Sequence, residues 1–214
     1  MSTIILVIAD LHGAYSARQF AYRNIELYKP EIVVVAGDIT NFGPSEWARE
    51  FVNDISTKAS TTIAIPGNCD TPNVAEELEC SDCIALHSKK INIGNLVFVG
   101  FGGSNITPFN TPLEFSEYYI YDSLHKIVEI GCILITHCPA KGTLDYISGK
   151  GNLGSESIAK IVEEYKPKLH ISAHIHEARG IVKKDNTLHL NPGQASKGCA
   201  ALVRIDDKIY AELL

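Results

Sequence analysis

Three short runs of apolar, largely β-branched residues mark the first third of this 214-residue chain. They lie at residues 3–9 (TIILVIA), 32–36 (IVVVA) and 61–65 (TTIAI). Continuous apolar runs are typical of strands that are buried on both faces of a sheet. Segments with helical spacing or helix-start signals follow each run, at residues 16–28, 44–56 and 72–79. This alternation predicts an α/β fold with parallel strands and helical crossovers.

The rest of the chain extends this pattern. Residues 90–101 predict a hairpin around Gly94-Asn95, and Thr111 with Glu114 fits a capping box for a helix running to about residue 129. Buried strands are expected at 132–136 and 169–173, separated by a Gly-rich loop at 142–154 and a helix at 155–165. Short strands and turns follow to the end. With no internal repeat or linker, residues 1–214 are expected to form one domain.

Composition and charge narrow the class of protein. The net charge of −6 argues against holding nucleic acid by bulk electrostatics. No stretch approaches the roughly 18 to 20 apolar residues of a membrane span, so we expect a cytoplasmic protein with no membrane partner. The six cysteines are expected to be free thiols. Cys80 and Cys83 form a lone CxxC, which without a second pair favours two unrelated thiols over a redox or metal site.

Polar residues of three types follow the carboxyl ends of five predicted strands. They are Asp10, His12, Asp38, Asn68, Asp70, His137, His174 and His176. Ligands of open α/β sheets bind outside these strand ends. Carboxylate, amide and imidazole groups suit divalent metals, and the set is too large for one closed tetrahedral site. It favours two metals that share a bridging carboxylate. Each residue alone could instead cap a helix or hold a turn, but five coincident strand ends favour a metal site.

The remaining histidines do not lie at predicted strand ends with other candidate ligands and are expected to be structural or surface residues. They are His87, His125, His170 and His189.

The same residues, in this order and approximate spacing, resemble the calcineurin-like metallophosphoesterases. The matching motifs span residues 4 to about 195 and are Asp10-x-His12, Gly37-Asp38, Gly67-Asn68-Cys69-Asp70, His137 and His174-x-His176. The segments SAHIHEARG and LNPGQAS look most like small prokaryotic and archaeal phosphoesterases. The resemblance implies two packed mixed β-sheets flanked by helices, a four-layer α/β/β/α sandwich with its metals at the sheet edge.

The resemblance also implies two sets of ligands. One metal would be held by Asp10, His12, Asp38 and His176, and the other by Asp38, Asn68, His137 and His174. The cofactors would be two divalent transition metal ions, with manganese preferred and iron, nickel or zinc compatible. The implied activity is hydrolysis of a small phosphoester by in-line attack of a metal-bridging hydroxide. Asp38, Asn68 and Cys69 are the candidate catalytic residues.

Cys69 departs from the common pattern, because many members of the family have histidine after the asparagine. A thiol is a weak hydrogen-bonder and a poor proton donor to an alkoxide. Cys69 therefore predicts substrates whose leaving group needs little protonation, and so a phosphodiesterase. Two other interpretations of Cys69 stay open, a direct metal ligand and a redox-sensitive thiol.

Two other functions compete with this one. The fold can serve as a non-catalytic scaffold for protein interactions, but a scaffold would be expected to lose the ligands that this chain keeps. A zinc deaminase would need H-x-E followed by P-C-x-x-C, and neither motif occurs.

Some further residues are candidates for contact with substrate. They are Asn41, Lys150 and Arg179. The stretch 151–155 could bind phosphate at a helix N-terminus, or be a plain loop with Ser155 as the N-cap.

Overall fold

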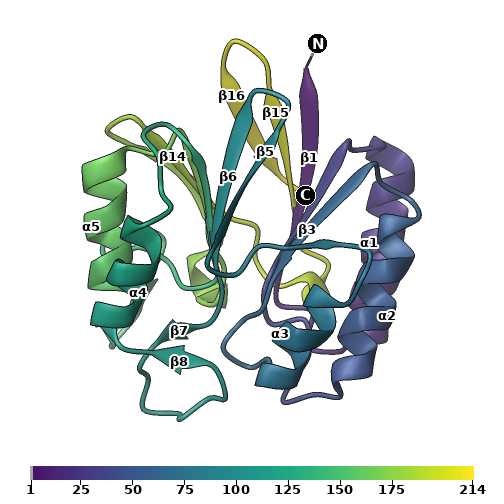
Figure 1. The fold of residues 1–214 in the computed structure, drawn as a ribbon, viewed down its shortest axis with the longest axis horizontal. Coiled ribbons are helices and arrows are strands. Elements are labelled where there is room, and N and C mark those ends of the chain that lie inside the picture. Colours follow the sequence, from purple (N-terminus) through teal and green to yellow (C-terminus); the bar gives the residue numbers. More distant parts are fainter. Residues whose placement is uncertain (1) are drawn as a thin grey trace.

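Two six-stranded mixed sheets form the centre of the protein, in a computed structural model that describes residues 2–214 (Figure 1). The first sheet has the order β16 (Ile209–Leu213), β15 (Ala201–Ile205), β1 (Thr3–Ile8), β2 (Ile32–Ala36), β3 (Thr61–Ile65) and β4 (Ile84–Ala85). The second has the order β13 (Gly180–Lys184), β14 (Thr187–Asn191), β12 (Leu169–Ile171), β9 (Ile133–Thr136), β6 (Leu96–Phe101) and β5 (Lys89–Ile93).

Helices cover the outer face of each sheet. Figure 1 shows α1 (Tyr15–Tyr28), α2 (Ser45–Ser56) and α3 (Pro72–Glu79) on one side, and α4 (Glu117–His125) and α5 (Glu156–Tyr165) on the other. The predicted α/β class and its two packed mixed sheets flanked by helices are therefore confirmed. Within the described residues, no helix combines the length and the apolar character needed to cross a membrane.

The apolar runs are continuous because each central strand faces two cores. Ile5 and Val7 of β1 point into the core between the sheets, whereas Leu6 and Ile8 pack under α1 and α2. All four side chains are fully buried. A third apolar cluster lies beneath α4 and α5. The lack of polar alternation in these strands is thus a direct result of their place between two layers.

The capping box predicted at Thr111 is wrong as a helix start. Helix α4 begins later, with Ser116 as its N-cap, whose side chain accepts a hydrogen bond from the backbone of Tyr119. Thr111 lies instead in the loop between two short paired strands, β7 (Ser104–Asn105) and β8 (Glu114–Phe115), and Glu114 is the first residue of β8. The Gly-rich loop likewise contains a small hairpin, β10 (Tyr146–Ile147) with β11 (Gly151–Asn152).

Strand direction brings the carboxyl ends of many strands to one edge. β1, β2, β3 and β4 are mutually parallel, as are β6, β9, β12 and β14 in the second sheet. In Figure 1, β1 starts at the top beside the N-terminus and runs downward. The loops that leave these strands therefore gather where the two sheets meet, as ligand-binding loops of α/β folds do.

The core between the sheets should dominate the stability of the fold. Phe98 of β6 is fully buried there, whereas Phe109 is 73% exposed. We expect Phe98→Ala to lower the free energy of unfolding by about 3–5 kcal/mol, because it leaves a cavity between two close-packed sheets. Phe109→Ala is the matched control and should cost less than about 0.5 kcal/mol. Urea unfolding in the presence of a chelator measures both, and equal losses would contradict this packing.

Candidate metal centre

The structure brings all seven predicted metal ligands to the seam between the two sheets. Four residues follow strands β1, β2 and β3 of the first sheet and are Asp10, His12, Asp38 and Asn68. The other three follow β9 and β12 of the second sheet and are His137, His174 and His176. Direct contacts join the two sheets, because His137 Nε2 lies 3.0 Å from Asn68 Oδ1 and 3.3 Å from Asp38 Oδ1. The strand-end prediction therefore placed these side chains in one region.

The backbone turns sharply at four of these residues. Asp10, His12, Asp38 and His174 have φ angles of 53°, 50°, 47° and 67°, in the left-handed region that non-glycine residues seldom adopt. Backbone hydrogen bonds hold the first turns together, from Asp10 N to Gly37 O at 3.1 Å and from His12 N to Asp38 O at 2.9 Å. Strained turns of this kind persist where the surrounding structure fixes them and cluster at functional sites.

Glycine is required at position 67 because the turn after β3 approaches Asp38 closely. A Cβ atom on Gly67 would lie 2.1 Å from both the backbone nitrogen and Oδ1 of Asp38. No side chain fits at that separation, so any larger residue would displace the Asp38 carboxylate. The glycine in the Gly67-Asn68 motif is therefore explained by contact with a ligand residue from the neighbouring strand.

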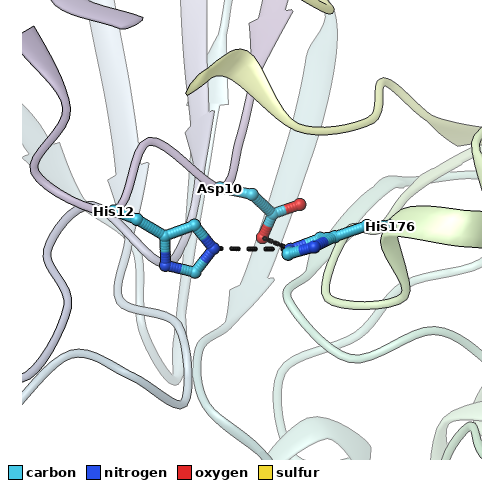
Figure 2. A group of neighbouring side chains, drawn as sticks. All are labelled: Asp10, His12 and His176. Carbon is cyan, nitrogen blue, oxygen red and sulfur yellow. Dashed lines mark hydrogen bonds and ion pairs between the residues drawn. The ribbon is translucent and has the colours of Figure 1, made fainter. Parts of the chain in front are cut away.

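Asp10 is the side chain that most needs a cation. It is fully buried, and neither carboxylate oxygen has a hydrogen-bond partner within the described residues. Figure 2 shows His12 and His176 directed toward it. The Nε2 atom of His176 lies 3.6 Å from Asp10 Oδ1 and 3.4 Å from His12 Nε2, longer than a good hydrogen bond. A buried carboxylate without donors is costly, and a metal between these three groups would compensate it.

The pKa values of the two histidines beside Asp10 shift in opposite directions. Asp10 raises the pKa of His176 against the opposing effect of burial. Burial lowers the pKa of His12, although Asp38 and Asp10 pull in the other direction. Both rings are only partly exposed. A metal would bind here to the neutral form of each imidazole.

His137, on the other side of Asp38, also faces oxygen atoms that lack a donor unless a cation or a proton lies between them. Its Nδ1 lies 2.8 Å from the carbonyl oxygen of Ala36, which can only accept, so Nδ1 carries a proton. Its Nε2 then faces two oxygens that also only accept, Oδ1 of Asn68 and Oδ1 of Asp38. Three ligand atoms thus converge, and a cation would fit between them. A second proton on the ring can take that position instead.

The pKa values of His137, Asp38 and His174 reflect their mutual electrostatic interactions. Burial alone would lower the pKa of His137, but the charge of Asp38 raises it to about 9. Burial opposes ionisation of Asp38, yet His137 holds the pKa of that carboxyl well below its usual range. Burial and then the charge of His137 lower the pKa of His174 to about 4, so this ring is neutral. His174 stands against His137, with ring centroids 5.3 Å apart.

Groups of metal-type ligand atoms within 4.8 Å of one another occur three times at this centre. They are Asp10 with His12 and His176, Asp10 with Asp38 and His137, and His12 with Asp38 and Cys69. His174 belongs to none of these groups among the described residues, although it borders His137. The residues present therefore suit divalent cations on both sides of Asp38.

Cys69 lies at the edge of the centre. Its backbone N–H donates to Asp38 Oδ1 at 2.8 Å, and its sulfur is 3.7 Å from Asn68 Nδ2. Burial and then the negative charge of Asp38 raise the pKa of the thiol far above its usual range. The side chain is therefore a protonated, weakly polar group beside the ligands, and not a thiolate nucleophile.

Asp70 organises the loops and does not join the ligands. Its carboxylate accepts hydrogen bonds from the backbone N–H groups of Ile39, Thr40 and Gly67 at 2.7–3.0 Å, and from the Thr40 hydroxyl at 2.8 Å. Burial and the nearby Asp38 raise its pKa to about 6. It ties the turn after β3 to the turn after β2.

Two of the other candidate contacts are already occupied within the protein. Arg179 donates from Nε to Pro192 O at 3.1 Å and from its guanidinium to Leu214 O at 2.7 Å. The N-terminus of α5 is filled by Glu117, which accepts from the N–H groups of Glu156 and Ser157. Of the two alternatives for this stretch, the structure therefore favours the plain loop with Ser155 as the N-cap. Asn41 and Lys150 are exposed.

One neighbour of the centre was missed in the sequence. The hydroxyl of Thr111 accepts a hydrogen bond from Asn68 Nδ2 at 3.0 Å. Thr111 comes 43 residues after Asn68, and its own motif predicted a helix cap. A contact of this range leaves no signal in local sequence spacing.

Comparison with known proteins agrees with the geometry. The chain is 37% identical over 199 residues to an uncharacterized protein of Methanocaldococcus jannaschii, covering 90% of this chain and 88% of that protein. A solved structure from Thermus thermophilus superimposes with a TM-score of 0.75 at 16% identity, over 99% of both chains. A structure described as a novel archaeal phosphodiesterase has a TM-score of 0.57 at 16% identity, over 99% of this chain and 100% of that one.

A sequence-family model matches most of the chain, and not only the individual motifs. The model of the calcineurin-like phosphoesterases covers residues 3–178, which include every residue of the metal centre described above. The resemblance seen in the strand-end residues is therefore confirmed, and this chain belongs to the calcineurin-like phosphoesterase family.

Proposed function

We propose that this protein is a phosphoesterase with two metal ions, and that it prefers phosphodiesters. The observation that carries the proposal is the buried carboxylate of Asp10, which has no hydrogen-bond donor within the described residues and faces two imidazoles. A scaffold protein has no use for such a group, because it costs stability whenever no cation is bound. The net charge of −6 supports a small phosphoester over nucleic acid as the substrate.

Asp38 is the shared ligand in this proposal. Its Oδ2 lies 3.9 Å from His12 Nε2, and its Oδ1 lies 3.3 Å from His137 Nε2, so it reaches both histidine groups. Asp10, His12, Asp38 and His176 would hold one ion; Asp38, Asn68, His137 and His174 would hold the other. When bound, the two dications would supply an activated water and neutralise charge that develops on the phosphoryl group. Manganese is our first candidate, and iron, nickel and zinc suit the same ligands.

The protein would hold most of the metal ligands in a buried environment with little access for water. Asp10, Asp38, Asn68 and His137 are each at most 4% exposed, so the partly exposed residues of the centre are His12, Cys69, His174 and His176. Substrate would approach from the side of these residues. Cys69 stands beside Asp38 as a protonated thiol, which is a weak hydrogen-bond donor to a leaving oxygen. Esters with good leaving groups, such as aryl diesters, should therefore be hydrolysed faster than alkyl monoesters.

Substitution of the shared ligand tests metal-dependent hydrolysis. Protein purified without chelator should carry about two transition metal ions per chain. We expect Asp38→Asn to lower kcat for bis(p-nitrophenyl) phosphate by about 100-fold or more, because the amide bears no charge to share between two cations. Asp185→Asn, on the exposed β13–β14 turn, is the matched control and should leave kcat unchanged. Absence of both metal and hydrolysis in wild type with added manganese would favour a scaffold.

Substitution of Cys69 tests the preference for diesters. An imidazole at this position can donate a proton to a poor leaving group, which general acids accelerate by about 100-fold or more. We expect Cys69→His to raise kcat/KM for an alkyl phosphomonoester at least about tenfold relative to the aryl diester, and Cys69→Ser to leave this ratio near the wild-type value. Faster turnover of the alkyl monoester by wild type would count against the assigned preference.

A further inference from the structure

The amide of Asn68 can serve a cation only in one orientation. Its oxygen can bind a metal, whereas its NH₂ group can only donate hydrogen bonds. Rotation by half a turn exchanges the two ends with little change in shape. In this structure Oδ1 faces His137 Nε2 at 3.0 Å, and Nδ2 faces Thr111 Oγ1 at 3.0 Å. The group that binds Nδ2 therefore decides which end is presented to the metal centre.

Thr111 can only accept a hydrogen bond from Asn68. Its single hydroxyl proton is given to Glu114 Oε1, at an oxygen–oxygen distance of 2.5 Å. An ionised carboxylate accepts and does not donate, so the proton cannot come from Glu114. The lone pairs of Thr111 Oγ1 are then left to receive an N–H group. An Asn68 oxygen turned toward Thr111 would meet another acceptor, with no proton between them.

Glu114 is held in the form that this arrangement needs. It also accepts hydrogen bonds from Thr111 N at 2.9 Å, Thr107 N at 3.0 Å and Thr107 Oγ1 at 2.6 Å. Partial burial opposes its ionisation, but the hydrogen bonds from Thr107 and Thr111 lower the pKa of Glu114 below its usual value. Charge-assisted bonds of this kind are stronger than neutral ones. Thr111 therefore has a fixed hydroxyl direction.

The main chain fixes the distance between Thr111 and Asn68. Leu113 N donates to Asn68 O at 3.1 Å, and Gly103 N donates to Pro66 O at 2.9 Å. Ser104 N closes the loop by donating to Leu113 O at 3.1 Å. Figure 1 shows the β7–β8 segment at the lower left, at the same end of the molecule as the strand-end loops. The loop is thus attached to the turn after β3 by both backbone and side chains.

We propose that Thr111, held by Glu114, is a positioning residue that turns the oxygen of Asn68 toward the metal centre. The inference rests on the proposed function, and it concerns one metal position alone. Within the described residues, Thr111 makes its side-chain hydrogen bonds to Asn68 and Glu114, and makes none to Asp10, His12 or His176. Loss of its hydroxyl should therefore weaken the ion beside Asn68 and spare the other.

Thr111→Val tests this by keeping the shape of the side chain and removing the hydroxyl. Manganese is titrated by calorimetry into the full chain after removal of metal with a chelator. Wild type should show two binding events. In Thr111→Val we expect one of them to weaken by about 10–100-fold, as for other groups that orient metal ligands, and the other to change less than about twofold. Thr111→Ser, which restores the hydroxyl, should recover most of the lost affinity.

Thr107→Val is the matched control. Thr107 also gives its hydroxyl proton to Glu114 Oε1, but it does not contact Asn68. It should therefore keep both manganese affinities near wild type. Melting temperatures of the metal-free variants report on folding. Glu114→Gln is a second variant that keeps Thr111 and frees its hydroxyl to rotate, and it should weaken the same site by several-fold. It carries the test alone if Thr111→Val does not fold.

The outcomes separate this inference from the function on which it rests. Wild type that binds no manganese would overturn the proposed function. Wild type with two sites, together with Thr111→Val and Glu114→Gln variants of unchanged affinity, would overturn the positioning role alone. Equal weakening of both sites, or an equal effect of Thr107→Val, would show a merely structural loop and would also overturn it.

Discussion

The structure is organised around two buried carboxylates that lie where the sheets meet. Asp10 and Asp38 are at most 3% exposed, and Asp10 has no hydrogen-bond donor within the described residues. Burial of such groups is unfavourable unless positive charge lies beside them. In the protein alone the neighbouring histidines supply that charge, which is why the pKa of His137 rises to about 9. Cations bound as proposed above would supply more positive charge.

The segment Gly67 to Asp70 shows how densely the surrounding loops are used. Gly67 allows close approach to Asp38, and Asn68 faces His137. Cys69 gives its backbone N–H to Asp38, while Asp70 ties two turns together through four hydrogen bonds. Gly67 and Cys69 thus meet Asp38, Asn68 meets His137, and Asp70 holds the turn in place. A substitution in this segment would therefore affect the metal centre and the seam between the sheets at once, and the two effects need separate controls.

Much of the fold and most of the centre could be predicted from the sequence, because both depend on local patterns. Apolar runs reveal buried strands, and parallel strands bring their carboxyl ends to one edge. Two local patterns could not be interpreted from the sequence alone. Thr111 and Glu114 have the spacing of a helix cap, and that prediction is wrong, whereas residues 151–155 left both an anion site and a plain loop with an N-cap open. In the structure a distant residue decides each case, since Asn68 binds Thr111 and Glu117 fills the N-terminus of α5. Such partners leave no local signal.

The central claim is that Asp38 lies between two metal ions. Anomalous diffraction at the manganese edge, from crystals soaked in manganese chloride, tests it most directly. The account predicts two peaks about 3.5–4 Å apart with Asp38 between them. One peak should lie beside Asp10, His12 and His176, and the other beside Asn68, His137 and His174. A single peak, or peaks away from Asp38, would contradict the account.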